Sequence, residues 1–349
     1  MEPDRVRGWT GMDINPRHAD FDAIPVIDFA SITSSDPDIR ATAAAALRDV
    51  CIRVGFFYLS NHDVPPVIVD DCFSQARAYF AGSLDAKMQT HISKSAHHRG
   101  YGAMLEEQTD AKGGADLHEA FDLSHDVPVD DPEVVRGCWL SGPNAWPDDA
   151  PDFRAALEAY YAAMLALGGH LFSSFALALG LPEDHFVPML DRPGSFMRVL
   201  HYPPQPPRSG AGSDGDSLGI GAHSDYECFT ILAQDDVGGL QVRNARGQWI
   251  EASPMAGCFV INIGDMMARW TNDLFASTMH RVINRSGRER YSIPFFYGVD
   301  YDVTIETLPN CIDPGQPPRY SPINAHDYVA ARIKDTYTLY EPDASNTPA

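Results

Sequence analysis

The sequence predicts a mainly β fold in which a jelly-roll core, a double-stranded β-helix, is flanked by helices from both ends of the chain. Short runs rich in β-branched and aromatic residues alternate with turn signals from about residue 195 onward. Their close spacing is typical of a sandwich or barrel rather than of βαβ units. Helical patterns lie before this region and at the end of the chain. We therefore expect the 349 residues to form a single domain.

The part before the core is expected to be largely helical. Residues 1–23 are polar and aperiodic, which predicts a loose arm. The part from about 24 to 190 is expected to contain strands at 24–29 and 56–59 and helices at about 39–54, 67–80 and 152–179. The stretch 94–130 is rich in Gly, His and Asp and shows no period, so it is expected to be irregular.

The jelly-roll core is predicted at about 195–310, and a C-terminal helix at about 322–341. The expected strands of the core are FMRVLHY, CFTILAQ, GLQVR, QWIEA, CFVINIG, STMHRVIN, RYSIPFFYG and YDVTIETL. A Pro- and Gly-rich loop at 203–219 leads into a further strand that carries His223.

The charge and cysteine content narrow the class of protein. The chain has 48 Asp and Glu against 26 Lys and Arg, a net charge of −22, which disfavours nucleic acid and anionic membranes as partners. A small substrate, even a charged one, remains compatible with this composition. The six cysteines form no C-x-x-C pair, the first residues show no apolar h-region, and no 18-residue apolar run occurs, so we expect neither a signal peptide nor a membrane span. These features indicate reduced thiols and a cytoplasmic protein.

A pair of residues within GAHSDYECFTILAQDDVGGLQV points to a metal site. His223 and Asp225 are separated by one residue, and on a strand such a spacing directs both side chains to one face. A second H-x-D, His18 and Asp20, lies in the aperiodic arm and is interpreted as coincidence. His280, inside a later β-rich run, supplies a third ligand. Two histidines and one carboxylate form the facial triad of non-haem Fe(II) oxygenases.

Two alternatives apply to these residues: a zinc site with the same ligands, or ordinary polar residues on strands. Zinc hydrolases usually carry a signature such as H-E-x-x-H, which is absent here. A second group of residues favours the iron hypothesis. Arg290 and Ser292 share one strand face, and Tyr202 lies on the cavity face of another strand, so together they suit a buried carboxylate.

The chain resembles the isopenicillin N synthase-like Fe(II)/2-oxoglutarate-dependent dioxygenases over nearly its whole length. The shared motifs, in order, are IPVIDF, GFFYLSNHDVP, RGYG, HEAFDL, MRVLHYPPQ, the GAHSDYECFTILAQDDVGGLQV stretch, NIGDMMARWTND, STMHRVIN, RYSIPFF and SPINAHDYV. The resemblance implies Fe(II) on His223, Asp225 and His280. It also implies 2-oxoglutarate on Arg290, Ser292 and Tyr202, with O2 as the third reactant, and release of succinate and CO2. In plant relatives an asparagine often occupies the position of Leu200, so the cosubstrate contacts here differ in that respect.

Five residues are candidates for contact with the small-molecule substrate. Arg198 and Phe296 share strand faces with the cosubstrate residues, although Arg198 also suits a salt bridge and Phe296 also suits the core. The resemblance adds Tyr101, Met104 and Phe121, for which a core or loop role is the alternative. His97–His98 and His118–Glu119 lie in the irregular stretch and are interpreted as solvated or loop-capping groups.

The resulting hypothesis is an oxygenase that oxidises, by default hydroxylates, a small organic molecule. The alternative is an iron-dependent oxidase of the same fold that cyclises or desaturates its substrate without 2-oxoglutarate, because the R-x-S motif also binds other carboxylates. A catalytically inactive binding protein is a third interpretation, which the intact triad disfavours. The residues identify neither the substrate nor the oligomeric state.

Overall fold

The computed structural model describes residues 20–336 except 111–113 and 206–217. Most of the predicted arm, most of the 203–219 loop and the predicted continuation of the C-terminal helix past residue 336 lie outside the described residues.

Helices dominate the first half of the described chain, and strands follow one another from β5 to β10. The strands are β1 (Val26–Asp28), β2 (Phe56–Ser60), β3 (Gly100–Gly102), β4 (Glu119–Ser124), β5 (Phe196–Tyr202), β6 (Ile220–His223), β7 (Phe229–Gln234), β8 (Leu240–Arg243), β9 (Trp249–Glu251), β10 (Phe259–Ile263), β11 (His280–Val282), β12 (Arg290–Tyr297), β13 (Thr304–Ile305) and β14 (Ile323–Asn324). The α-helices are α1 (Phe29–Ile32), α2 (Pro37–Arg53), α3 (Pro66–Phe80), α4 (Leu84–Lys87), α5 (Pro132–Val135), α6 (Pro151–Ala178), α7 (Asp265–Trp270) and α8 (Ala325–Thr336).

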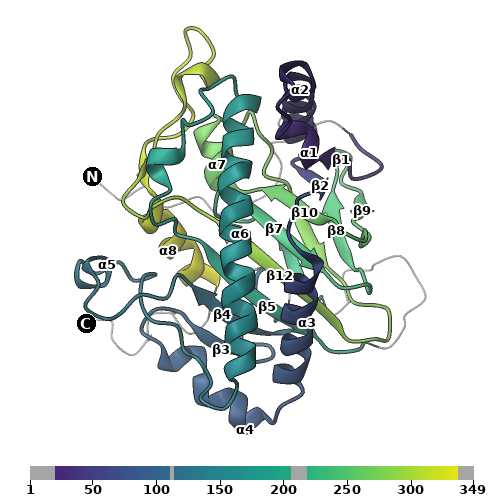
Figure 1. Ribbon diagram of the computed structural model, residues 1–349, viewed down its shortest axis with the longest axis vertical. Helices are drawn as coiled ribbons and strands as arrows, with labels where there is room; N and C mark the ends of the chain where they lie inside the picture. Colours follow the sequence, from purple (N-terminus) through teal and green to yellow (C-terminus); the bar gives the residue numbers. More distant parts are fainter. Residues whose placement is uncertain (1–19, 111–113, 206–217, 337–349) are drawn as a thin grey trace, which may run out of the picture.

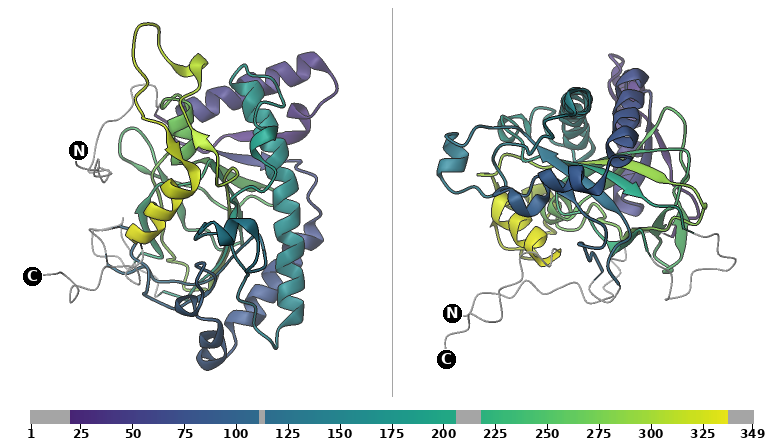
Figure 2. Two further views of the ribbon diagram at one scale, coloured as in Figure 1. Left: turned by 90° about the vertical axis from the view of Figure 1, so that its left-hand side faces the viewer. Right: turned by 90° about the horizontal axis from the view of Figure 1, so that it is seen from below.

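Two sheets form an open jelly roll rather than a closed barrel. The larger sheet has the order β1-β2-β10-β7-β12-β5-β4-β3, and the smaller has the order β6-β11-β8-β9. Helices α2, α3 and α6 lie across the outer face of the larger sheet (Figure 1), and α8 lies on the opposite side of this sheet (Figure 2). A cavity lies between the inner face of the larger sheet and the smaller sheet.

Helix α6 is the long support of the larger sheet. It begins with Pro151 at its first position, where the missing N–H would have no helical partner. Its length and composition would suffice to cross a membrane, but 56% of its most apolar window is buried within the protein, as in a core helix. The helix approaches β12 closely at Gly168, where an added Cβ would lie 2.0 Å from the ring of Tyr297.

The first helices follow local sequence signals. Asp36 caps α2 by accepting hydrogen bonds from the backbone N–H groups of Asp38 and Ile39. The turn into β2 depends on Gly55, which has φ of +70° and leaves no room for a Cβ against the carbonyl oxygen of Ala276. These elements agree with the predicted strand–helix–strand order at 24–59.

The segment 94–130 differs from the irregular structure predicted for it. It contributes β3 and β4 to the larger sheet, and β4 pairs with β5 along its length. The run at 301–308 also departs from the prediction of a core strand. Only the two-residue β13 forms there, between a turn at 301–302 and a 3-10 helix at Pro309–Cys311, and it pairs with β14 outside the two main sheets.

Candidate metal centre and active site

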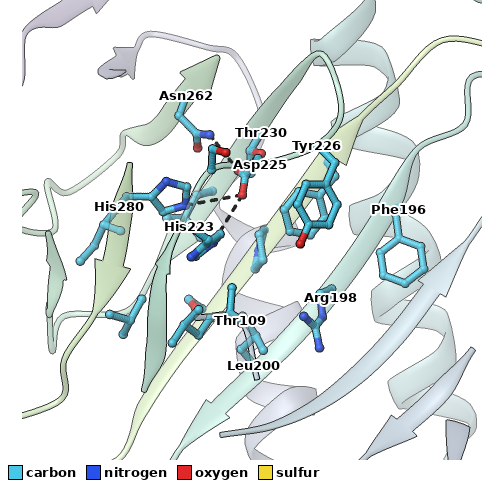
Figure 3. Close-up of a pocket in the computed structure, with 18 of the residues that line it drawn as sticks. Thr109, Phe196, Arg198, Leu200, His223, Asp225, Tyr226, Thr230, Asn262 and His280 are labelled. Atoms are coloured by element: carbon cyan, nitrogen blue, oxygen red, sulfur yellow. Dashed lines mark hydrogen bonds and ion pairs between the residues drawn. The ribbon is translucent and has the colours of Figure 1, made fainter. Parts of the chain in front are cut away.

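Three potential ligands converge at one end of the cavity between the sheets. His223 ends β6 and His280 begins β11, and the two residues are direct partners in the antiparallel pairing of these strands. Asp225 Oδ1 lies 3.6 Å from His223 Nε2 and 3.5 Å from His280 Nε2 (Figure 3). The ligand atoms of all three residues lie within 4.8 Å of one another.

Backbone carbonyl groups fix both imidazole rings. His223 Nδ1 lies 2.8 Å from the carbonyl oxygen of Gly221, and His280 Nδ1 lies 3.2 Å from that of Thr278. Because a carbonyl oxygen only accepts, each Nδ1 must carry the proton and donate it. Each Nε2 lone pair is then available to a metal ion, the usual arrangement of a metal-binding histidine.

The carboxylate is held by two residues that the sequence analysis did not select. Asp225 Oδ2 accepts hydrogen bonds from the Thr230 hydroxyl and from Asn262 Nδ2, the latter at 2.7 Å, and both donors are buried. This leaves Oδ1 directed at the histidines. Burial alone would raise the pKa of Asp225, but the positive charge of the facing imidazoles of His280 and His223, when they are protonated, holds this pKa well below its usual value.

The geometric reason for the His223–Asp225 pairing differs from the predicted one. Strand β6 ends at His223, so Asp225 lies in the following turn and not on the same strand face. The turn is fixed instead by Asp265, at the start of α7, whose backbone N–H donates to the Asp225 carbonyl oxygen at 2.8 Å. The Asp265 carboxylate also accepts hydrogen bonds from Ser224 and Ser277, and so joins the two segments that carry the candidate ligands.

A fully buried arginine lies elsewhere in the same cavity. Arg290 donates to Ser292 Oγ and to Gln234 Oε1, each at 3.1 Å, and its Nε has no hydrogen-bond partner. Across the described residues, no carboxylate lies within ion-pair distance of this guanidinium. Tyr202 is the direct strand partner of Arg290, and its hydroxyl lies 3.5 Å from Ser292 Oγ. A buried cation surrounded by hydroxyl groups suits the carboxylate of a ligand.

Two strands line the cavity with alternate residues, as the period-two pattern predicts. The lining residues of β12 are Arg290, Ser292, Pro294 and Phe296, and those of β5 are Phe196, Arg198, Leu200 and Tyr202. The three metal-ligand candidates line the same cavity. The structure therefore brings together the predicted metal site, the predicted carboxylate site and two of the five substrate candidates.

The other three substrate candidates lie outside the cavity lining. Tyr101 is buried and donates its hydroxyl hydrogen bond to Glu119 Oε2. Phe121 is a core residue on the opposite face of β4, where its ring contacts Tyr79. Met104 is half-buried and is likewise not part of the cavity wall. Their placement reflects the strands β3 and β4, which the sequence analysis did not predict.

Two of the histidines interpreted as solvated or loop-capping groups, His98 and His118, are buried, whereas His97 is half-buried with its Nδ1 3.2 Å from the carbonyl oxygen of Trp139. His98 is 1% exposed and lines the cavity, and burial, followed by the charge of Arg198, lowers its pKa to about 3. His118 is 3% exposed, and its Nε2 lies 3.0 Å from Glu107 Oε2. Glu107 also lines the cavity and was missed. The interpretation of His98 and His118 as solvated groups was wrong: His98 is buried in its neutral form, and His118 is buried against the Glu107 carboxylate.

The families that match this sequence agree with the metal-site geometry. Residues 24–149 match the N-terminal family of non-haem dioxygenases in morphine synthesis, and residues 193–299 match the 2OG-Fe(II) oxygenase superfamily. The chain belongs to the Fe(II)/2-oxoglutarate-dependent oxygenases.

Relatives from fungi and plants support the same assignment for the oxygenase. It is 37% identical to the 2-oxoglutarate-Fe(II) type oxidoreductase hxnY of Emericella nidulans, over 90% of each chain. It is 34% identical to the homoarginine-6-hydroxylase 2-ODD-C23 of Glycine max, over 83% of this chain and 89% of that protein. These names support dependence on 2-oxoglutarate and not the alternative of an oxidase that works without it.

A solved structure with a bound cosubstrate has the same fold. A full-length protein of Neurospora crassa, crystallised in complex with α-ketoglutarate (2-oxoglutarate) and thymine, superposes with a TM-score of 0.77. The two chains are 28% identical, and the match covers 90% of this chain and 97% of the Neurospora protein. The oxygenase thus uses Fe(II), 2-oxoglutarate and O2 to oxidise a small organic molecule.

Proposed function

We propose that His223, Asp225 and His280 bind the Fe(II) ion and that Arg290, Ser292 and Tyr202 bind the distal carboxylate of 2-oxoglutarate. The observation that carries this proposal is that one cavity holds both a converging two-histidine, one-carboxylate group and a buried arginine without a counter-ion among the described residues. Nitrogen and oxygen donors of this kind suit Fe(II) and leave coordination positions open.

The protein's own residues have distinct tasks in this scheme. When bound, Fe(II) and 2-oxoglutarate supply the activation of O2, with release of succinate and CO2. Asn262 and Thr230 orient Asp225 so that one carboxylate oxygen faces the ion. Arg290 positions the cosubstrate by charge, while apolar residues such as Leu232 and Val282 line the cavity and limit access of water.

Hydroxylation is the proposed outcome for a substrate that enters beside the metal site. The thymine bound to the Neurospora crassa protein and the hydroxylase activity in the name of the soybean relative support a compact organic substrate. Arg198 and Phe296 lie where they can contact it. Nucleic acid and anionic membranes are not proposed as partners because of the net charge of −22. A cytoplasmic location is proposed because none of the six cysteines forms a disulfide.

An anaerobic titration tests this assignment. Fe(II) and 2-oxoglutarate are added to the purified protein, and the metal-to-ligand charge-transfer absorption is recorded. We expect a band in the wild type and none in His223→Ala. A variant that retains the band, with the affinity for Fe(II) unchanged, would contradict the metal assignment.

A further inference from the structure

The second cavity arginine differs from Arg290 in being held by carboxylates of the protein. Arg198 Nε donates to Asp122 Oδ1 at 2.8 Å. Its two terminal nitrogens donate to the two oxygens of Glu107, at 3.0 and 2.9 Å. Asp122 is the direct partner of Arg198 in the β4–β5 pairing, so the strand register sets this contact. Arg198 therefore has two counter-ions of its own.

Glu107 is the acidic residue of this group that lines the cavity, whereas Asp122 does not. Its Oε2 accepts a hydrogen bond from Arg198 and lies close to His118 Nε2. Within the described residues, its Oε1 accepts one hydrogen bond, also from Arg198. A carboxylate oxygen accepts about two hydrogen bonds. One acceptor position of Oε1 thus remains for a donor in the cavity, which Glu107 lines together with His98.

The two arginines predict opposite preferences at the two ends of one cavity. An anionic group is favoured near Arg290, which no carboxylate of the described residues neutralises. Near Arg198 an anionic group would face Glu107, while Asp122, buried outside the cavity lining, also neutralises Arg198, and like charges in a poorly hydrated site repel strongly. Figure 3 shows Arg198 beside Phe196, away from the two metal-site histidines. Phe196 and its strand partner Phe296 add an apolar wall there.

We propose that the substrate carries no carboxylate at this end and instead presents an N–H donor, from an amide, lactam or amine nitrogen, to Glu107. The inference rests on the proposed function, since it assigns the substrate end of the same cavity. Arg198 then acts chiefly by fixing the Glu107 carboxylate, and the paired phenylalanines favour a small apolar or ring-shaped body. The substrate class is a neutral or cationic nitrogen compound.

Three probes of nearly identical shape test this charge preference: benzoate, benzamide and benzamidine. They carry charges of −1, 0 and +1 on one planar frame. Their affinities are measured by calorimetry, anaerobically, with Fe(II) and saturating 2-oxoglutarate so that Arg290 is occupied. We expect benzamide and benzamidine to bind at least about tenfold more tightly than benzoate. Tightest binding of benzoate, or no detectable binding of any probe, would overturn the proposal.

Two variants assign the preference to Glu107. In Glu107→Gln the ratio of benzamidine to benzoate affinity should fall about tenfold or more, because one negative charge is removed from the cavity. The matched control is Glu106→Gln, whose carboxylate pairs with His91 and does not line the cavity, and which should leave the ratio unchanged. An unchanged ratio in Glu107→Gln would refute the proposal. If Glu107→Gln does not fold, the order of the three probe affinities in the wild type still tests the proposal.

Failure of the proposed function gives a different result. If 2-oxoglutarate produces neither heat nor a charge-transfer band, the cosubstrate assignment is wrong. The affinities of the three probes are then measured in Arg290→Met, in which benzoate can no longer bind at Arg290. Their order in this variant still tests the inference about Glu107.

Discussion

The sharpest test of the carboxylate site is Arg290→Met. Methionine keeps much of the length of the side chain but removes the charge and all the N–H donors. The native guanidinium is fully buried, its Nε is unpartnered, and the described part of the chain places no carboxylate beside it. A buried charge of this kind destabilises the protein until an anion binds. The variant should therefore lose affinity for 2-oxoglutarate without losing stability in its absence.

The expected magnitude follows from the donors that are lost. A hydrogen bond to a charged group contributes about 1.5–3 kcal/mol, so two bonds from Arg290 contribute about 3–6 kcal/mol. Ser292 and Tyr202 retain their hydroxyl groups next to the ligand, which favours the lower half of this range. A loss of about 3–4 kcal/mol raises the Kd for 2-oxoglutarate by about 10²–10³-fold.

The Kd is measured by anaerobic titration of the charge-transfer band, and Tm is measured with and without 2-oxoglutarate. At about 100 times its Kd the ligand stabilises the wild type by about 2.7 kcal/mol, and at the same concentration it stabilises the variant by at most about 0.4 kcal/mol. Arg288→Ala is the matched control, because Arg288 lies two residues before Arg290 and forms an exposed pair with Asp236. A rise in Kd of less than about tenfold, or an equal rise in the control, would refute the reasoning.

Three further substitutions test the metal site and the fold. His223→Ala should abolish succinate release while circular dichroism and Tm show a folded protein; retained turnover would contradict its role as a ligand. Asn262→Ala should weaken Fe(II) affinity by about 10–100-fold, measured by metal titration, because the carboxylate ligand loses an orienting donor; an unchanged affinity would count against this. Gly168→Ala should lower the stability measured by urea unfolding by about 1–3 kcal/mol, since its Cβ would overlap the Tyr297 ring. Gly169→Ala, with its nearest contact at 3.9 Å, should not, and equal losses would disprove the packing argument.

The parts of the site that local periodicity controls could be predicted from the sequence. Arg290 and Ser292 lie on β12, and Tyr202 lies on β5, where alternation alone decides which residues face the cavity. Asp225 lies beyond the end of its strand, so its place depends on Asn262 and on the start of α7. The sequence selected Asp225 as a candidate ligand, but its position beside the two histidines depends on tertiary contacts.

Strand β4 shows why the segment 94–130 was misjudged. Its residues Glu119 to Ser124 are all buried, although they include Glu119 and Asp122, and such charges rarely occupy a fully buried strand. Each charge has a partner from a distant segment: Lys87 and His201 for Glu119, and Arg198 for Asp122. Alternation between apolar and polar residues cannot identify a strand whose charged residues are buried and paired with opposite charges from other segments.

The same physics separates the two arginines of the cavity. In sequence, Arg198 and Arg290 look alike, since each occupies an inward position on a strand and each suits a carboxylate. Their chemical roles differ because Glu107, far from Arg198 along the chain, folds back onto it and Asp122 pairs with it across the sheet, whereas no described carboxylate reaches Arg290. A local pattern predicts where a guanidinium lies. Whether that guanidinium attracts an anionic ligand depends on how far carboxylates of the protein already neutralise its charge. For this oxygenase that balance favours a carboxylate on the cosubstrate and disfavours one on the substrate.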